Sequence, residues 1–266
     1  MSSSKAWTVF SFFKYWLNAV DAHSLQSPFA FDFYESIVAS KKNHQDFLQI
    51  ERLRQKLQKD HRAIQIKDYG AGSRRHVSSR RKISDIVHYG ISRPRFSQML
   101  YRLVSHYKPQ NIIELGTSLG VNTLYLAKAN HQNQVTTFEG CPQLAAVARE
   151  NFDRLRRDNI KLIEGDLNYT LQAHLATTDQ VDLVFFDANH QFEPILGYFN
   201  QCLEKAHSDS IFIFDDIHWS GEMEKAWSKI KSEPSVTLSF DLFQAGIVCF
   251  APTATKQELV LEVPFW

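Results

Sequence analysis

The sequence predicts an α/β fold in which a doubly wound, seven-stranded sheet follows an α-helical N-terminal extension. From residue 109 onward, short apolar runs alternate with longer segments of helical spacing, as in parallel sheets with crossover helices. Before that point the apolar positions have helical spacing. The last two apolar runs are joined by a link too short for a helix, which predicts an antiparallel hairpin. We therefore expect a helical extension with a basic loop over residues 1–108 and a ligand-binding domain over 109–266.

Length and composition are those of an ordinary globular protein. The 266 residues include 44% hydrophobic and 22% charged ones, enough for a sizeable core. Thirty basic residues against 29 acidic ones leave a formal net charge of +1, so the global field attracts neither nucleic acid nor an anionic membrane. The three scattered cysteines favour reduced thiols over disulfides or a zinc site, and we expect a cytoplasmic protein.

The first predicted helix covers residues 6–20. Lys14 interrupts this apolar stretch, and its length falls short of a bilayer span, so we expect no membrane-spanning segment. Its apolar side chains recur at spacings of three and four and share one face: Trp7, Phe10, Phe13, Leu17 and Val20. We expect this face to pack on the domain or on a second subunit of a homodimer.

Further helices are predicted in the rest of the extension. Ser27 and Pro28 are typical of a helix start, because serine caps the first turn and proline suits the first helical position. Apolar spacing extends the prediction to three helices, within residues 23–40, 46–60 and 94–107.

A charge anomaly lies in residues 61–95. Nine basic residues against two acidic ones give this segment a net charge of +7. Residues 68–79 within it read as a loop, because glycines and serines replace any apolar period. Two interpretations stay open: a basic lid that selects an anionic ligand, and a solvated arm held by salt bridges.

The domain that follows is predicted to contain five parallel strands and a hairpin. The parallel strands are Asn111–Leu115, Gln134–Phe138, Ile160–Ile163, Val181–Phe186 and Ser210–Phe214. After a helix around Glu222–Lys231, the hairpin strands are Ser235–Phe240 and Gly246–Phe250. Ligands bind beyond the carboxyl ends of such strands, and each of the five ends in acidic residues: Glu114, Glu139, Asp166, Asp187 and the pair Asp215–Asp216.

The first strand leads into a glycine turn that predicts a nucleoside site. Gly116 and Gly120 are spaced G-x-x-x-G, not G-x-G-x-x-G, so the close approach to a pyrophosphate is less well supported. Glu139 lies 23 residues after Gly116, where a carboxylate at the end of the second strand can accept hydrogen bonds from ribose hydroxyls. Basic residues are missing near the turn, which suits a ligand with an ammonium or sulfonium charge.

The sequence at this point resembles the class I S-adenosylmethionine-dependent methyltransferases. Residues 114–122 (ELGTSLGVN) are similar to the first motif of the catechol and caffeoyl-CoA O-methyltransferases, and 181–190 and 211–218 to their later motifs. The resemblance covers residues 110 to about 250. It implies a Rossmann-like fold with the last strand antiparallel, S-adenosylmethionine as cofactor and O-methylation of a small molecule with the help of a divalent metal.

The resemblance also implies roles for individual residues. Gly116 would pass beside the methionine part of the cofactor, Glu139 would hold the ribose, and Asp166 would lie by the adenine amino group. The cofactor set is Glu114, Gly116, Thr117, Ser118, Gly120, Glu139, Gly165, Asp166 and Asp187. The metal ligands would be Asp187, Asp215 and Asp216, and the catalytic pair would be His190, as the base, with Asp187. Two positions depart from the family, which often has Asn at position 216 and, in the catechol enzymes, Lys at position 190.

Elementary electrostatics supports the acidic cluster independently. Neighbouring strands lie about 4.8 Å apart, so Asp187 and Asp215 are expected side by side, and two such carboxylates need a proton or a cation between them. A set of oxygen ligands suits Mg²⁺ or Ca²⁺, which would lower the pKa of a substrate hydroxyl for His190 to deprotonate.

Three alternatives stay open from sequence. In the first, Asp215–Asp216 serves only to cap the following helix. In the second, the basic segment binds RNA or another polyanion, either in a binding protein or in an RNA methyltransferase; the sparse aromatics disfavour nucleic acid. An NAD-dependent oxidoreductase is disfavoured by the glycine spacing.

Overall fold

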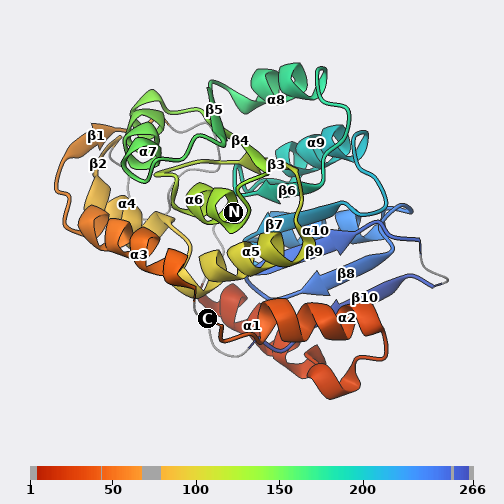
Figure 1. Cartoon of the computed structure of the whole chain (residues 1–266). Helices are drawn as coiled ribbons and strands as arrows, with labels where there is room; N and C mark the ends of the chain where they lie inside the picture. The colour runs from red at the N-terminus through yellow and green to blue at the C-terminus, as the bar shows by residue number, and fades with distance from the viewer. Residues whose placement is uncertain (1–4, 43, 68–78, 253–254, 264–266) are drawn as a thin grey trace. The chain divides into compact units, whose positions relative to one another are not determined.

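The computed structural model describes residues 5–42, 44–67, 79–252 and 255–263, and it confirms the α/β class (Figure 1). Eight strands form the main sheet, which is mostly parallel, and helices connect them. The chain divides into two compact units: the segment up to Ala39 with the segment from Gln172 onward, and Ser40–Leu171. The boundary predicted between residues 108 and 109 lies inside the second of these units.

The Ser40–Leu171 unit contains the first three strands of the main sheet. β3, β4 and β5 are parallel neighbours, and the end of β4 pairs Glu139 with Glu164. The elements of this unit are α3 (Gln45–Gln58), β1 (Ala63–Gln65), β2 (Arg80–Lys82), α4 (Ile83–Gly90), α5 (Pro94–Tyr107), β3 (Asn111–Leu115), α6 (Val121–Ala129), β4 (Gln134–Glu139), α7 (Pro142–Arg154) and β5 (Ile160–Glu164). α8 (Leu167–Leu175) begins in it.

This unit holds three elements that the apolar pattern did not predict. β1 and β2 form a separate antiparallel pair, and α4 follows directly. Both strands have only three residues, and β2 is entirely basic, so neither contains an apolar run. The predicted loop over 68–79 lies outside the described residues except for Ser79.

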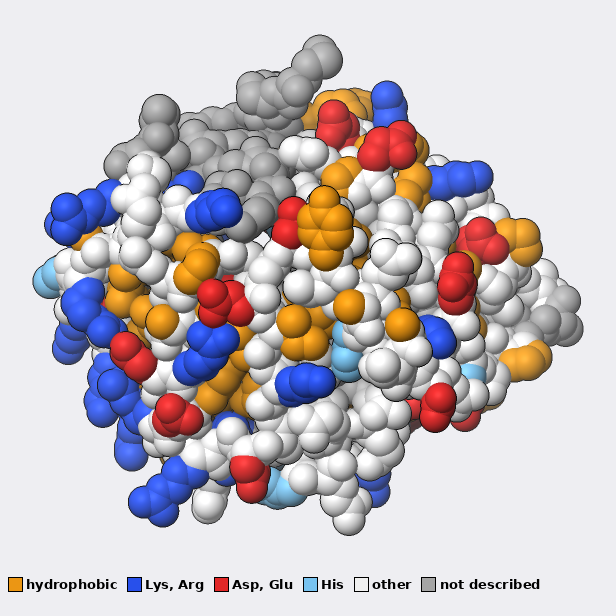
Figure 2. Space-filling view, turned by 90° about the horizontal axis from the view of Figure 1, so that it is seen from above, with side chains coloured by type: hydrophobic (Ala, Val, Ile, Leu, Met, Phe, Trp, Pro, Cys, Tyr) orange, Lys and Arg blue, Asp and Glu red, His pale blue; other side chains and the backbone are white. Residues whose placement is uncertain are grey.

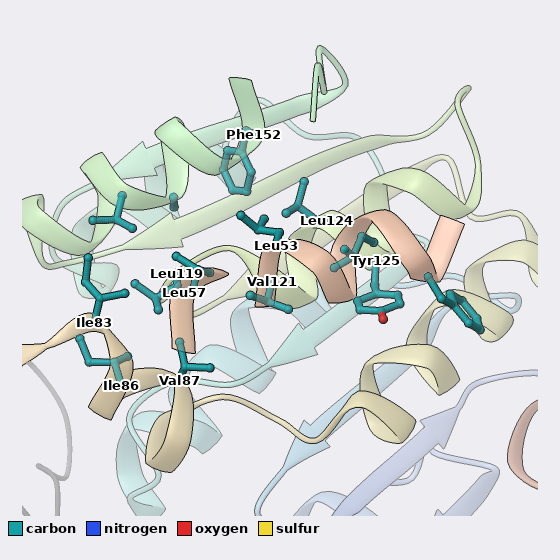
Figure 3. Packing of buried hydrophobic residues seen from close by; sticks show 14 of the residues in the cluster. Leu53, Leu57, Ile83, Ile86, Val87, Leu119, Val121, Leu124, Tyr125 and Phe152 are labelled. Atoms are coloured by element: carbon teal, nitrogen blue, oxygen red, sulfur yellow. The ribbon is translucent and has the colours of Figure 1, made fainter. Parts of the chain in front are cut away.

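The core of this unit lies between α3, α4, α6 and α7 (Figure 3). Leu53 and Leu57 of α3 pack with Val121 and Leu124 of α6, and Phe152 of α7 joins the same cluster. The apolar spacing that predicted a helix within residues 46–60 therefore corresponds to the buried face of α3. Burial of these apolar side chains holds α6, the helix that follows the glycine turn, in place.

The other unit contains the remaining strands, in the order β10-β8-β9-β7-β6. Its elements are α1 (Lys5–Asn18), the short helix η1 (Ala22–Ser24), α2 (Pro28–Phe33), the π-turn η2 (Tyr34–Val38), β6 (Leu183–Phe186), α9 (Phe192–Leu203), β7 (Ile211–Asp215), α10 (Gly221–Ser232), β8 (Leu238–Asp241), β9 (Ala245–Cys249) and β10 (Gln257–Val260). Ser27 caps α2 by accepting a hydrogen bond from the Ala30 N–H at 3.4 Å, as predicted.

The hairpin prediction is confirmed and the strand number is corrected. β8 and β9 are antiparallel, and β9 is also antiparallel to β7. β10 adds an eighth strand, parallel to β8, where the sequence predicted seven. An edge strand of four residues with partial burial carries only two adjacent apolar residues, Leu259 and Val260, too few for a recognisable run.

Aromatic side chains fill the core around β6 and β7. Phe185, Phe186, Phe212 and Phe214 are completely buried, and the rings of Phe186 and Phe214 stack with centroids 4.3 Å apart. These phenylalanines are sheet core residues and are not available to line a substrate pocket.

The N-terminal helix is oriented differently from the expectation that its apolar face packs on the domain. Ser11 and Tyr15 are its buried residues, whereas Phe10, Phe13 and Leu17 are exposed. The inward residues make hydrogen bonds: the Ser11 hydroxyl donates to Glu224 Oε1 at 2.8 Å, and the Tyr15 hydroxyl to the carbonyl of Leu261. No helix in the described part of the chain is both long and apolar enough to cross a membrane.

Candidate functional site

The glycine turn after β3 is built from positive-φ residues and held by the end of β4. Gly116 has φ 104°, and its N–H and that of Thr117 both donate to the carbonyl of Phe138, at 3.1 and 3.0 Å. Ser118 also has positive φ, and its N–H donates to Glu139 Oε2 at 2.8 Å. The chain can make this sharp turn because glycine adopts positive φ without steric cost.

Gly120 closes the turn and starts α6. It has φ 76°, and a Cβ at this position would overlap the ring of Phe152 and press on Ala148. Its N–H donates to the Thr117 carbonyl at 2.8 Å. The second glycine is therefore required by the packing of α7 against the turn.

Glu139 is the half-buried carboxylate at the centre of this unit's candidate site. Its Oε2 accepts from Ser118, and its Oε1 accepts from the Cys141 N–H at 2.9 Å, at the start of α7. The residue is only half-buried, so part of it remains accessible. Two amide donors thus orient a partly exposed carboxylate, an arrangement suited to a pair of ribose hydroxyls.

Gly165 and Asp166 lie after β5. Gly165 has φ 137°, and its N–H donates to the Glu139 carbonyl at 3.0 Å. Asp166 accepts from the Asn168 N–H at 2.9 Å through its side chain, and its carbonyl accepts from the Thr170 N–H at the first turn of α8. Gly165 therefore lies next to Glu139, and Asp166 stabilises the start of a helix.

Glu114 and Thr117 have their side chains in the interior. Oε2 of Glu114 accepts from the Thr123 and Thr137 hydroxyls, while Oε1 is buried with no hydrogen-bond partner in the described part of the chain. Burial raises the pKa of Glu114, the hydrogen bonds from the two hydroxyls lower it, and the result is a pKa of about 7. Thr117 is also buried, with its hydroxyl 2.6 Å from that of Thr137. Both side chains support the turn from below.

Asp187 and Asp215 belong to the other unit and lie next to each other. β6 and β7 are parallel in a register that pairs Phe186 with Phe214, so the next residues along each strand are adjacent, as predicted. Burial and the charge of Asp216 raise the pKa of Asp215, while hydrogen bonds from the Asp216 N–H and from the Gln244 and Asp187 side chains lower it, and the net direction is upward. The sequence did not single out Gln244, which lies in the short link between β8 and β9.

His190 lies close to Asp187. Its Nε2 is 3.8 Å from Asp187 Oδ1, and its buried Nδ1 has no hydrogen-bond partner in the described part of the chain. The ring of Trp219 is 5.9 Å away. A histidine held near a carboxylate with one ring nitrogen unengaged can take up a proton.

The loop after β7 decides one of the alternatives that the sequence left open. Ser220 caps α10 by accepting from the Met223 N–H at 3.2 Å, so Asp215–Asp216 is not the helix cap. His218 is held by Glu224 and Asp241, each 2.9 Å from a ring nitrogen, and has no nitrogen left for a metal. Asp216 has φ 57° and accepts from the Trp219 N–H through its carbonyl.

A metal centre with three ligands is not assembled. Among the described residues, which include all three aspartates, no group of three or more His, Cys, Asp or Glu side chains is placed to hold a metal ion. Asp187 and Asp215 alone form a carboxylate pair. Mg²⁺ often uses one or two carboxylates together with water and substrate oxygens, so the pair fits such an ion even though the triad does not form.

The basic arm is attached beside Glu139. The Lys67 N–H donates to Cys141 Sγ and the Cys141 thiol to the Gln65 carbonyl, both at 3.5 Å. Arg62 makes ion pairs with Asp60 at 2.8 Å and Glu150 at 3.2 Å, which fits a salt-bridged arm at its base. Lysine and arginine side chains gather toward one edge of the face in Figure 2.

Comparisons with known proteins agree with this geometry. Residues 113–217 match the family described as a methyltransferase domain. Over 145 residues, the chain is 28% identical to a catechol O-methyltransferase of Niastella koreensis, an alignment that covers 53% of this chain and spans 62% of the relative.

Solved structures share the fold. An O-methyltransferase of Bacillus cereus in complex with S-adenosylhomocysteine aligns with a TM-score of 0.58 at 18% identity, over 84% of this chain and 97% of that one. TomG, an O-methyltransferase of Streptomyces achromogenes in complex with S-adenosylmethionine, aligns with a TM-score of 0.57 at 14% identity, over 83% and 94%.

The matched methyltransferase domain and the shared fold make this chain similar to the class I S-adenosylmethionine-dependent methyltransferases. Within that class, the chain is similar to the catechol and caffeoyl-CoA type of O-methyltransferase, as the sequence resemblance indicated. The alternative of a polyanion-binding protein or RNA methyltransferase is not favoured by these matches.

Proposed function

We propose that the protein transfers the methyl group of S-adenosylmethionine to a hydroxyl oxygen of a small, anionic acceptor. The observation that carries the proposal is Glu139, a half-buried carboxylate held by two backbone N–H donors beside a glycine turn. This arrangement supports a nucleoside cofactor, because a carboxylate at the end of the second strand can accept hydrogen bonds from ribose hydroxyls.

The reaction needs a base and a positioned acceptor. The acceptor oxygen attacks the methyl carbon, the carbon–sulfur bond breaks, and S-adenosylhomocysteine leaves with the electron pair of that bond. We assign the hydroxyl proton to His190, whose Nδ1 has no hydrogen-bond partner among the described residues and whose Nε2 is near Asp187. Asp187 then stabilises the charged imidazole. Positioning supplies much of the rate enhancement in such transfers.

We further propose that Asp187 and Asp215 hold a divalent cation such as Mg²⁺. The support is the adjacency of the two strand ends together with the raised pKa of Asp215, since burial and the charge of Asp216 leave this carboxyl in need of a proton or a cation. A cation bound there would favour the ionised form of an acceptor hydroxyl. The proposal places Asp216 outside this pair.

The anionic character of the acceptor is inferred from the basic arm. Lys67, Arg80 and Lys82 are exposed on an arm whose first strand is attached at Cys141, next to Glu139. A carboxylated or phosphorylated acceptor would be attracted to this charge at low ionic strength.

Calorimetric titration of S-adenosylhomocysteine tests the cofactor site. We expect binding by the wild type and an affinity at least about tenfold weaker in Glu139→Gln, because two charge-assisted hydrogen bonds to the ligand are weakened. Glu164→Gln is the matched control: Glu164 ends the neighbouring strand, pairs in register with Glu139 and makes only an exposed ion pair with Arg149. No binding by a folded wild type, or equal loss in both variants, would contradict the proposal.

A further inference from the structure

The N-terminal helix α1 turns its polar side inward and its apolar side outward. Ser11 and Tyr15 are buried and hydrogen-bonded to Glu224 and to the carbonyl of Leu261. Six large apolar side chains of the same helix are between 50 and 69% exposed: Val9, Phe10, Phe12, Phe13, Trp16 and Leu17. Soluble monomers normally orient such a helix the other way round.

The exposed side chains form one continuous face. Successive helical residues are about 100° apart, so these six fall within an arc of about 160°, roughly opposite to Ser11 and Tyr15. Lys14 lies outside the arc, Lys5 is the first residue of the helix, one turn before Val9, and no acidic residue occurs in α1. The face therefore has an aromatic centre without charge, which is the composition of the central part of protein interfaces.

The size of the face matches one side of a dimer interface. Four of the six side chains are aromatic. Aromatic side chains present about 150–250 Å² each when fully exposed, so these four, half to two-thirds exposed, present roughly 450 Å², and Val9 and Leu17 bring the face to roughly 600 Å². That is at the upper limit of patches on monomers, about 300–600 Å², and near the roughly 800 Å² per partner of a standard interface.

We propose that this face of α1 is covered by a second copy of the chain, with α1 packing on α1 across a two-fold axis. An isologous contact suits a patch whose centre is apolar, because two copies of such a patch are self-complementary. A lipid surface fits less well. Helices that lie on membranes have lysine- and arginine-rich polar faces, whereas the polar face of α1 is hydrogen-bonded into the protein.

Sedimentation velocity over about a hundredfold range of concentration tests the proposal on the full chain. We expect the wild type to be a dimer and Phe10→Glu/Leu17→Glu a folded monomer, since the exposed positions impose no packing constraint within one copy. Leu48→Glu is the matched control, because Leu48 is a similarly exposed apolar residue of α3, and it should leave the dimer intact. Mixing the glutamate variant with Phe10→Lys/Leu17→Lys should restore a dimer through opposite charges on the two α1 helices.

Several outcomes would overturn the inference. A wild type that is monomeric throughout the range removes the second copy, as does a dimer that the glutamate substitutions leave unchanged. Flotation with vesicles of phosphatidylcholine and phosphatidylglycerol, lost in the glutamate variant while the wild type is monomeric in solution, would make lipid the occupant. Should the double variant fail to fold, Phe13→Ser reduces the apolar area without adding charge, and unchanged self-association in that variant would also refute the proposal.

Discussion

Replacing Glu114 by glutamine should change the pH dependence of stability. This carboxyl is completely buried beneath the glycine turn, and burial raises its pKa from the ordinary 4.5 to about 7. Below pH 4.5 the carboxyl is protonated in both the folded and the unfolded chain, so it adds no pH-dependent penalty. Between pH 4.5 and 7 the unfolded chain releases the proton and the folded chain retains it, so the stability of the wild type falls as the pH rises.

The magnitude follows from the two pKa values. Each pH unit between them changes the free energy of unfolding by about 1.4 kcal/mol, so the loss reaches about 3 kcal/mol by pH 7 and then stays constant. Glu114→Gln cannot ionise and should lack this loss. Its constant offset, from placing an amide beside Thr123 and Thr137, is the same at every pH and cancels from the comparison.

Urea denaturation followed by tryptophan fluorescence at a series of pH values measures the effect. The free energy of unfolding of Glu114→Gln minus that of the wild type should increase by about 3 kcal/mol from pH 4.5 to 7.5. Glu164→Gln, which removes an exposed carboxylate, should parallel the wild type. Parallel profiles for Glu114→Gln and the wild type would refute the reasoning, because the buried carboxyl would then ionise as easily as in the unfolded chain.

Three other outcomes are expected. Gly120→Ala should lower the free energy of unfolding by about 1–3 kcal/mol because of strain at positive φ and overlap with Phe152. Gly197→Ala should not destabilise the protein, because the new methyl group has open space around it. Chemical denaturation of both variants checks this. Burial lowers the pKa of His218, but its two carboxylate partners raise it more. The stabilisation that His218→Gln removes should therefore be present at low pH and disappear as the pH rises through the raised pKa. Denaturation at several pH values checks this, and an equal loss of stability at all pH values would contradict it. Mg²⁺ should raise the melting temperature of the wild type and not that of Asp187→Asn, and EDTA should reverse the rise; no response in the wild type would remove the proposed cation.

The chemistry at the strand ends could be predicted because parallel strands bring their carboxyl ends to one edge. The adjacency of Asp187 and Asp215 needed only the strand order and the side-chain period of two. Ser220 could not be recognised as the true cap of α10, because serine and aspartate are equally good caps and the loop geometry decides between them. Gln244 carries no signal in the sequence, since its position beside Asp215 depends on the β8–β9 hairpin folding back on β7.

The face of α1 that is buried was not predictable from the periodicity of the helix. Helical spacing identifies an apolar face but not what covers it, and interior packing was one of two readings that the pattern allowed. The structure turns the other side inward because Ser11 and Tyr15 have hydrogen-bond partners there. A polar residue at an inward position is therefore explained by its partner, which lies more than 200 residues away in the sequence.

Glu114 and Glu139 show why an acidic residue near a strand end does not by itself define a site. Glu114 lies one residue before the end of β3 and is enclosed between two threonine hydroxyls, so its burial favours the protonated form. Glu139 is the last residue of β4, is half-buried, and receives two backbone N–H donors that favour the ionised form. A displacement of one residue along the strand thus separates a carboxyl that supports the turn from one that can bind a ligand. The two substitutions should accordingly differ in their effect on the cofactor: Glu139→Gln should weaken S-adenosylhomocysteine binding, whereas Glu114→Gln should leave binding in place and change the pH dependence of stability.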